Sequence, residues 1–261
     1  IDLVIICTIN RDHGAITQAA LEADKHVIVE YPLALCPYEA KNLIDLAKKK
    51  DKLLHVEHME LIGGLHQTIR SFLPQIGELA YARYATISSQ AGRQKKWSYN
   101  YEMFGFPLSA ALSRIHRLTN LFGSVQQVSC QSRFWQSEDA GYFSACLCNA
   151  QLYFSQGVTA EITYGKGDVF THSYRNFEIH GKEGTLIFAG EEGYLWRGKK
   201  KISLPVTPRR GLFAQDTRMV LDYLWENKPL YVQPTDSLYA LTVADVARIS
   251  AATGKTITLD D

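Results

Sequence analysis

Two arginines and a tyrosine are the residues of this sequence best suited to bind a small ligand. Arg114 and Arg117 are three residues apart in "SRIHRL" and are therefore neighbours on a helix surface. Steps of about 100° per residue put Arg114 at the edge of the apolar stripe and Arg117 further round, towards solvent. A guanidinium pairs bidentately with carboxylates, so Arg114 is the better candidate, with an interdomain salt bridge as the alternative. Tyr31 follows an apolar strand, where it could border a ligand or simply pack beside Pro32.

Four ionisable residues alternate at the end of another strand, two on each face: His55, Glu57, His58 and Glu60. Histidine and carboxylate side chains can ligate a metal, but nothing else in the sequence converges on them. We therefore predict no metal site and expect a solvated strand end.

Composition limits the class of partner. The chain has 261 residues, a formal net charge of +1 and 21% charged residues. This balance produces no field that would attract nucleic acid or an anionic membrane, so we predict a small-molecule substrate. No run of about 18 apolar residues and no signal-like start occurs, which indicates a cytoplasmic protein. The cysteines lack zinc-site spacing and are interpreted as reduced packing thiols: Cys7, Cys36, Cys130, Cys146 and Cys148.

Residues 1–60 alternate between strand and helix patterns. Strand–helix–strand units of this length form right-handed crossovers and a parallel sheet. We predict part of a Rossmann-like dinucleotide-binding domain over residues 1–60. Its strands are expected at 2–8, 25–30 and 52–58, and its helices at 13–23 and 37–50, the second with Pro37 at its start and lysines at its end.

The glycine-rich turn that holds a dinucleotide's phosphates is missing from the sequence, which contains no G-x-G-x-x-G. The chain opens directly on a buried parallel strand, so we expect that roughly seventy residues carrying this turn precede it in the parent protein. Without the turn we expect the chain to be inactive or nearly so, because the cofactor loses its pyrophosphate site.

Residues 61–261 have a different pattern and are predicted to form a second, substrate-binding domain. Long strands joined by short turns indicate a large, open antiparallel sheet. One helix, expected at 106–122, should lie against the first domain or across the sheet, and two C-terminal helices are expected on the surface, with Asp236 capping the second. The strands are expected at 78–88, 125–135, 142–154, 158–165, 174–181 and 184–190, and the C-terminal helices at 212–227 and 235–252.

The first domain carries a family motif. "DLVIICTINRDHGAITQAALEADKHVIVEYPLA" is similar to the second half of the dinucleotide-binding domain of the Gfo/Idh/MocA oxidoreductases. The resemblance implies NADPH or NADH as cofactor, although the choice between them is read in the segment expected before Ile1. His13 could instead cap or pack at the start of its helix. The residues matching the family's cofactor edge are Thr8, Asn10, His13, Glu30 and, where the family has lysine, Tyr31.

Three residues that the family uses to oxidise sugars are replaced. Tyr31 takes the place of the lysine, and the aspartate and histidine positions fall near Ser109 and Ser113. Removing a hydroxyl proton needs a base of tuned pKa, and a neutral tyrosine with a pKa of about 10 and two serines are poor substitutes. Sugar dehydrogenation is therefore disfavoured.

One branch of the family carries the same replacements, and segments along nearly the whole chain resemble its cyanobacterial members, among them "KLLHVEHMELIGGLHQ" and "FGFPLSAALSRIHRLTNLFG". The resemblance implies reduction of biliverdin to bilirubin by hydride transfer from NADPH or NADH to the central methine bridge, with protonation of a neighbouring pyrrole nitrogen. It also assigns Arg114 to the reduction. A guanidinium with a pKa above about 12 releases a proton reluctantly, so we expect Arg114 to position the tetrapyrrole and direct a proton from water or a ligand carboxyl.

Other substrate contacts follow from the same resemblance. Arg209 and Arg210 in "TPRRGLF" could meet the ligand's two propionates or form a solvated charge pair. Arg117 and Glu57 are weaker candidates, the latter near the nicotinamide, and Tyr31 could stack on the tetrapyrrole. The alternatives are a sugar or polyol oxidoreductase of the same family, or a protein that binds tetrapyrrole without turnover. The sequence does not determine the oligomeric state.

Overall fold

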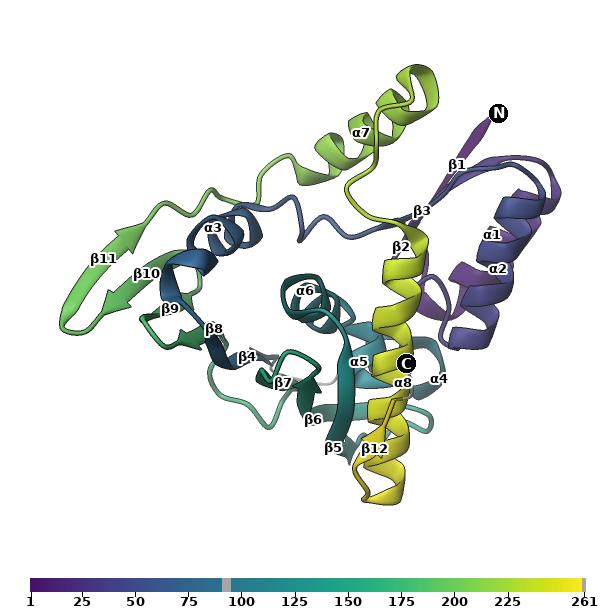
Figure 1. Ribbon diagram of the computed structural model, residues 1–261. Helices are drawn as coiled ribbons and strands as arrows, with labels where there is room; N and C mark the ends of the chain where they lie inside the picture. The colour runs from purple at the N-terminus through teal and green to yellow at the C-terminus, as the bar shows by residue number, and fades with distance from the viewer. Residues whose placement is uncertain (91–94, 260–261) are drawn as a thin grey trace.

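The computed structural model describes residues 1–90 and 95–259, and these residues contain two β-sheets (Figure 1). The smaller sheet is parallel in the order β1-β2-β3, as the sequence predicts for its Rossmann-like part. Glu30 and Glu57 pair in register at the carboxyl ends of their strands. The elements are β1 (Leu3–Ile6), α1 (His13–Glu22), β2 (His26–Glu30), α2 (Pro37–Lys49) and β3 (Leu54–Glu57), with a 3-10 turn at Asn10–Asp12.

The larger sheet has nine strands in the order β11-β10-β9-β8-β4-β7-β6-β5-β12. Short turns make nearly all neighbours antiparallel, as predicted, but β4 and β7 are parallel because a long helical segment and two further strands separate them in the chain. Three of the nine strands, β10, β11 and β12, are not predicted from the sequence. The strands are β4 (Leu79–Ser89), β5 (Val125–Gln136), β6 (Phe143–Phe154), β7 (Thr159–Gly167), β8 (Tyr174–Gly181), β9 (Gly184–Ala189), β10 (Glu192–Arg197), β11 (Lys200–Leu204) and β12 (Ile257–Thr258).

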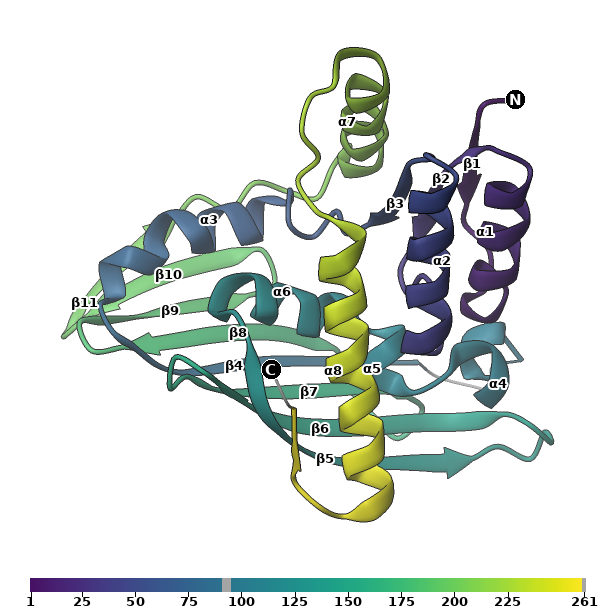
Figure 2. The same cartoon turned by 45° about the vertical axis from the view of Figure 1, so that its right-hand side comes forward.

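Helices cover one face of the larger sheet (Figure 2). The predicted helix at 106–122 breaks at Ala111, whose backbone leaves the helical region, and its apolar stripe is fully buried on both halves. None of the helices in the described part of the chain combines the length and apolarity needed to cross a membrane. The remaining elements are α3 (Gly64–Phe72), α4 (Tyr101–Phe104), α5 (Pro107–Ala110), α6 (Ser113–Phe122), α7 (Leu212–Glu226) and α8 (Pro234–Thr253), with 3-10 turns at Leu73–Ile76 and Trp97–Tyr99.

Helix α8 is not the surface helix that the sequence predicts. It packs on β5, α5 and α6 and also on α2, so that it joins the two sheets. Ala240, Ala244 and Ala247 are fully buried, and such small side chains allow a close approach that an apolar pattern alone does not reveal. The predicted cap is also wrong: Gln233 is the N-cap, and Asp236 sits three residues on and bonds back to it in a capping box.

The start of α3 fixes the segment that follows β11. Thr68 Oγ1 donates a hydrogen bond to the carbonyl of Pro205 at 2.7 Å. Gly64 lies so close to Thr207 that a Cβ atom on Gly64 would overlap the carbonyl oxygen of Thr207 and lie 2.6 Å from its nitrogen. Only glycine therefore allows this crossing.

We expect Gly64→Ala to destabilise the protein by about 2 kcal/mol, since backbone atoms of Thr207 must move. For a chain of this size the midpoint of thermal unfolding should fall by about 4–8 °C. Gly63→Ala is the matched control, because the nearest atom to its Cβ would be a methyl group of Leu212 at 3.3 Å. Equal midpoints for the two variants in a thermal melt would contradict the tight crossing.

Candidate active site

A pocket lies where the carboxyl edge of the parallel sheet faces the inner side of the large sheet. Tyr31 and Glu60, from the segments that follow β2 and β3, form one wall, and Tyr84 of β4 lies on the large sheet. Four arginines reach the pocket from three elements: Arg114 and Arg117 from α6, Arg175 from β8, and Arg209 from the segment between β11 and α7.

Arg114 and Arg117 present unpaired donors. Nη1 of Arg114 donates a hydrogen bond to Ser113 Oγ at 3.0 Å, and the guanidinium lies 5.3 Å from the centre of the Tyr164 ring. The guanidinium of Arg117 lies 5.9 Å from the centre of the Tyr84 ring. Within the described residues, Nε of Arg114 and both Nε and Nη1 of Arg117 are buried without a hydrogen-bond partner. The two guanidiniums thus keep donors that no other group of the described chain satisfies.

Arg117 is not directed towards solvent, which corrects the prediction from helical geometry. Its side chain is only 5% exposed, because both flanks of α6 are covered. On one side His66 of α3 bonds to Asn120 at 3.0 Å, and on another α8 packs along the helix. A helical wheel predicts only the side of a helix that its apolar residues bury. It does not show that other helices cover the remaining sides.

The sequence analysis missed Arg175, although the signal was present. Arg175 alternates with Phe177 and Ile179 along β8, and both of these are buried, so all three side chains share the inner face. Of the two arginines predicted to meet propionates, Arg209 lines the pocket, whereas Arg210 is exposed and does not line it.

The positive charge of the pocket affects the pKa of Tyr84. Burial would raise the pKa of this phenol, but the guanidiniums of Arg117, Arg114 and Arg175 outweigh burial and lower the pKa below its usual value. The Tyr84 ring also stacks on Phe177, with centroids 4.7 Å apart. The large sheet therefore presents an aromatic surface beneath a cluster of cations.

Tyr31 stands at the opposite wall. Its hydroxyl donates a hydrogen bond to Ser113 Oγ at 3.1 Å, and its ring stacks on the imidazole of His58 with centroids 5.2 Å apart and planes 5° from parallel. Burial is the main cause that raises the pKa of Tyr31, so the phenol stays protonated. Residues far apart in sequence thus fix both ends of this side chain.

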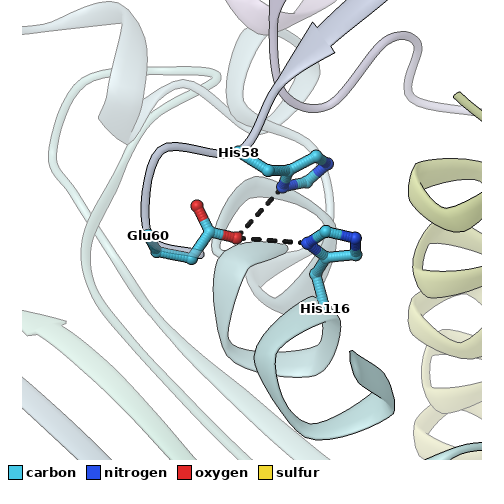
Figure 3. A group of neighbouring side chains, drawn as sticks. All are labelled: His58, Glu60 and His116. Carbon is cyan, nitrogen blue, oxygen red and sulfur yellow. Dashed lines mark hydrogen bonds and ion pairs between the residues drawn. The ribbon is translucent and has the colours of Figure 1, made fainter. Parts of the chain in front are cut away.

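Behind Tyr31 lies a buried cluster of His58, Glu60 and His116 (Figure 3). Oε1 of Glu60 faces Nδ1 of His58 at 3.1 Å and Nδ1 of His116 at 3.3 Å. Burial would raise the pKa of Glu60, but the two histidines outweigh it and lower the pKa, while burial lowers the pKa of His58 to about 4. The arrangement is a buried carboxylate oxygen that accepts one ring N–H group from each histidine.

The same three side chains could hold a metal ion, since their ligand atoms lie within 4.8 Å of one another. Hydrogen bonds already account for the geometry, because Nε2 of His58 also bonds to Ser237 Oγ at 2.9 Å. The absence of a metal stays a prediction. The expected solvated strand end, however, is wrong.

All four ionisable residues at the end of β3 are buried, because parts of the chain far away in sequence cover them. Nε2 of His55 lies 2.8 Å from Oδ1 of Asp216 in α7, and the hydroxyl of Tyr231 donates to the same oxygen at 2.6 Å. Glu57 accepts the backbone N–H of Met59 at 2.6 Å. Burial nevertheless raises the pKa of Glu57 to about 7.

The residues predicted at the cofactor edge divide into two groups. Thr8 is exposed just after β1, and Glu30 and Tyr31 are partly exposed at the end of β2, so these three can reach a ligand at the carboxyl edge. His13 and Asn10 are buried and join loops instead. His13 bonds to the carbonyls of Pro32 and Thr8 at 2.8 and 3.2 Å, and Asn10 donates to the carbonyl of Phe104 at 3.2 Å.

Two family models match the chain. The NAD-binding Rossmann fold of the Gfo/Idh/MocA oxidoreductase family matches residues 1–58, and the C-terminal alpha/beta domain of that family matches residues 74–259. The second match alone spans more than half of the chain.

Individual relatives agree with these matches. A crystal structure of biliverdin reductase from Synechocystis sp. PCC 6803, in complex with biliverdin and NADP+, is 56% identical, with a TM-score of 0.95 over 97% of this chain and 80% of that one. Mouse biliverdin reductase A is 33% identical over 129 residues, which are 49% of this chain but only 41% of the mouse protein. Aldose-aldose oxidoreductase from Caulobacter crescentus shares the fold, with a TM-score of 0.87 at 19% identity. The chain belongs to the Gfo/Idh/MocA oxidoreductase family.

Proposed function

We propose that this protein reduces biliverdin to bilirubin with NADPH or NADH, and that the pocket between Tyr31 and Arg114 holds the reacting part of the tetrapyrrole. The observation that carries the proposal is the 56% identity, over 97% of this chain, to a biliverdin reductase whose structure contains biliverdin and NADP+. The charges and aromatic rings of the pocket support it independently.

The charge balance of the pocket suits a dianion. Four guanidiniums line it and Glu60 supplies one buried carboxylate, which leaves an excess of positive charge. Biliverdin carries two propionates, and each can accept hydrogen bonds from the guanidiniums that line the pocket. Pairing a buried charged donor in this way contributes about 1.5–3 kcal/mol. Arg175 and Arg209 stand at the pocket's outer edge, where they can meet a second carboxylate.

The space available also suits a large, flat ligand. The pocket itself is small, but it shares Leu65, Arg175 and Arg209 with a groove of about 610 Å³ along the ends of β4, β8 and β9. Ligand sites in proteins typically enclose roughly 300–1,000 Å³. A tetrapyrrole can therefore place its central methine bridge near Tyr31 while its outer rings extend past Arg175 and Arg209.

The cofactor would approach from the carboxyl edge of the parallel sheet, where open α/β sheets bind dinucleotides. Thr8, Glu30 and Tyr31 are the residues of this chain that would hold its nicotinamide half. Glu57, in register with Glu30, adds a second carboxyl group at that edge, and carboxylates there favour the positively charged oxidised ring. When bound, the nicotinamide supplies the hydride.

The protein's own residues then bind, orient and shield the substrate. Arg117 anchors a propionate, and Arg114 lies beside the hydroxyl groups of Ser113 and Tyr31, where it stabilises negative charge on the pyrrole system. No lysine, aspartate or histidine occupies the family's positions for sugar oxidation, which are filled by Tyr31, Ser109 and Ser113. We place the reaction in the cytoplasm, where the free cysteines of the described chain would stay reduced.

The first test is turnover. Full-length protein mixed with biliverdin and NADPH should convert the green pigment to yellow bilirubin, followed as loss of red absorbance. A protein that binds biliverdin tightly in an absorbance titration, yet shows no colour change with either NADPH or NADH, would instead be a non-catalytic tetrapyrrole-binding protein. Reduction of NAD+ by polyols without bilin binding would indicate a sugar oxidoreductase.

The two helix arginines should have different kinetic effects. We expect Arg117→Ala to raise KM for biliverdin by about 10- to 100-fold with a smaller change in kcat, because it removes a charged contact made before and during reduction. Arg114→Ala should mainly lower kcat. Arg218→Ala, on the exposed side of α7, is the control and should leave both constants within about twofold. Identical effects of the first two variants would contradict the division of roles.

A further inference from the structure

Ser113 stands at the centre of the pocket's hydrogen-bond network. It begins α6, is 8% exposed and lines the pocket. Its Oγ atom accepts hydrogen bonds from the hydroxyl of Tyr31 at 3.1 Å and from Nη1 of Arg114 at 3.0 Å. A single hydroxyl group thus joins the aromatic wall to the cationic one.

The hydrogen-bond partners of Ser113 determine where its hydroxyl hydrogen can point. A serine hydroxyl has one hydrogen to donate and two lone pairs to accept with. Tyr31 and Arg114 occupy both lone pairs of Ser113, so its own hydrogen must point elsewhere, and the pocket is open beside it. The contact with a guanidinium also makes the hydroxyl a stronger donor, because positive charge stabilises the oxygen as the proton leaves.

From this geometry we propose that Ser113 is the residue that delivers the proton to the substrate's pyrrole nitrogen, and that Tyr31 restores the proton to Ser113. The proposal rests on the reduction of biliverdin proposed above and names the proton donor for it. Arg114 acts as a positioning residue, which holds Oγ of Ser113 and stabilises charge on it. The serine occupies the place where the family carries the histidine for sugar oxidation.

In the proposed reduction, one hydride and one proton are transferred to the tetrapyrrole. Hydride forms a C–H bond at the central methine carbon, and the electron pair of the conjugated system moves to the neighbouring nitrogen. That nitrogen takes the hydroxyl proton of Ser113, while Ser113 takes the phenol proton of Tyr31, so no free alkoxide is formed. The Tyr31 phenolate, near the Arg114 charge, regains a proton from water. The net reaction consumes one hydride and one proton.

The other groups nearby are poorer donors. A guanidinium has a pKa above about 12 and Arg114 is held in that form. Glu60 has no proton to give, because its carboxylate accepts from both His58 and His116. His58 is neutral and buried, and its Nε2 bonds to Ser237 instead of reaching the pocket. Of the side chains that contact Ser113, Tyr31 releases a proton more readily than Arg114, because a phenol is a stronger acid than a guanidinium.

The test compares four single variants of the full-length enzyme in single-turnover reductions of bound biliverdin. We expect Ser113→Ala to slow reduction about 100-fold, as for loss of a general acid, with biliverdin affinity changed less than about threefold. Ser113→Thr keeps the hydroxyl and should recover most of the rate. Tyr31→Phe should slow reduction about as much as Ser113→Ala does, since without the phenol the transfer would leave an alkoxide on Ser113. Thr119→Val deletes a hydroxyl from the same helix that bonds only to the carbonyl of His116, and serves as control.

A proton inventory in mixtures of H₂O and D₂O gives a second readout that needs no variant of Ser113. The unmodified enzyme should show a curved dependence, because two protons move together, and Tyr31→Phe should show a linear one. A linear inventory for both, or a rate within twofold of the unmodified enzyme for either Ser113→Ala or Tyr31→Phe, would each overturn the relay. Failure of the unmodified enzyme to reduce biliverdin would instead reject the proposed function, and the relay with it.

Discussion

The burial of guanidinium groups without a partner is the constraint on which the rest of this site depends. Removing a charge from water is costly unless other groups replace its hydration, and Arg114 and Arg117 achieve this only in part. Aromatic faces of Tyr164 and Tyr84 supply cation–π contacts, and Ser113 accepts one hydrogen bond. The N–H groups left over remain buried without a hydrogen-bond partner in the described part of the chain.

The opposite wall of the pocket rests on a buried hydrogen-bond network around the Glu60 carboxylate. Glu60 keeps its negative charge among buried groups because two imidazole N–H groups solvate it, and His58 in turn gives Tyr31 a flat surface to stack on. Helix α8 supplies the serine that bonds to the far nitrogen of His58. The position of the tyrosine ring is therefore set by contacts from three separate parts of the chain.

The family's fold explains how the proposed change of chemistry could arise with few substitutions. The carboxyl edge of the parallel sheet and the inner face of the large sheet stay in place, and the groups between them are exchanged. Where sugar oxidation needs bases that accept a proton, this chain has hydroxyl groups and guanidiniums, which suit the delivery of hydride and proton to a conjugated anion.

Several features could be read from the sequence because they depend on local patterns. The parallel strands, the helix beginning at Pro37 and six strands of the large sheet follow from apolar periodicity and turn residues, and Arg114 follows from its place on an apolar helix. The division near residue 60 stays a prediction. β10 and β11 escaped notice because their lysines and glycines resemble loop residues, and β-sheet pairing with β9 makes them strands.

Only the tertiary structure decided which polar residues are buried and which of them meet. The end of β3 looks solvated in sequence, yet α6, α7 and α8 cover it, and Arg117 looks exposed until the elements flanking α6 are in place. The contact between Tyr31 and Ser113 joins residues 82 positions apart. Sequence patterns report how one element faces the core, whereas burial and hydrogen bonding depend on several elements at once, and this is why the sequence determined the framework and tertiary packing determined the site.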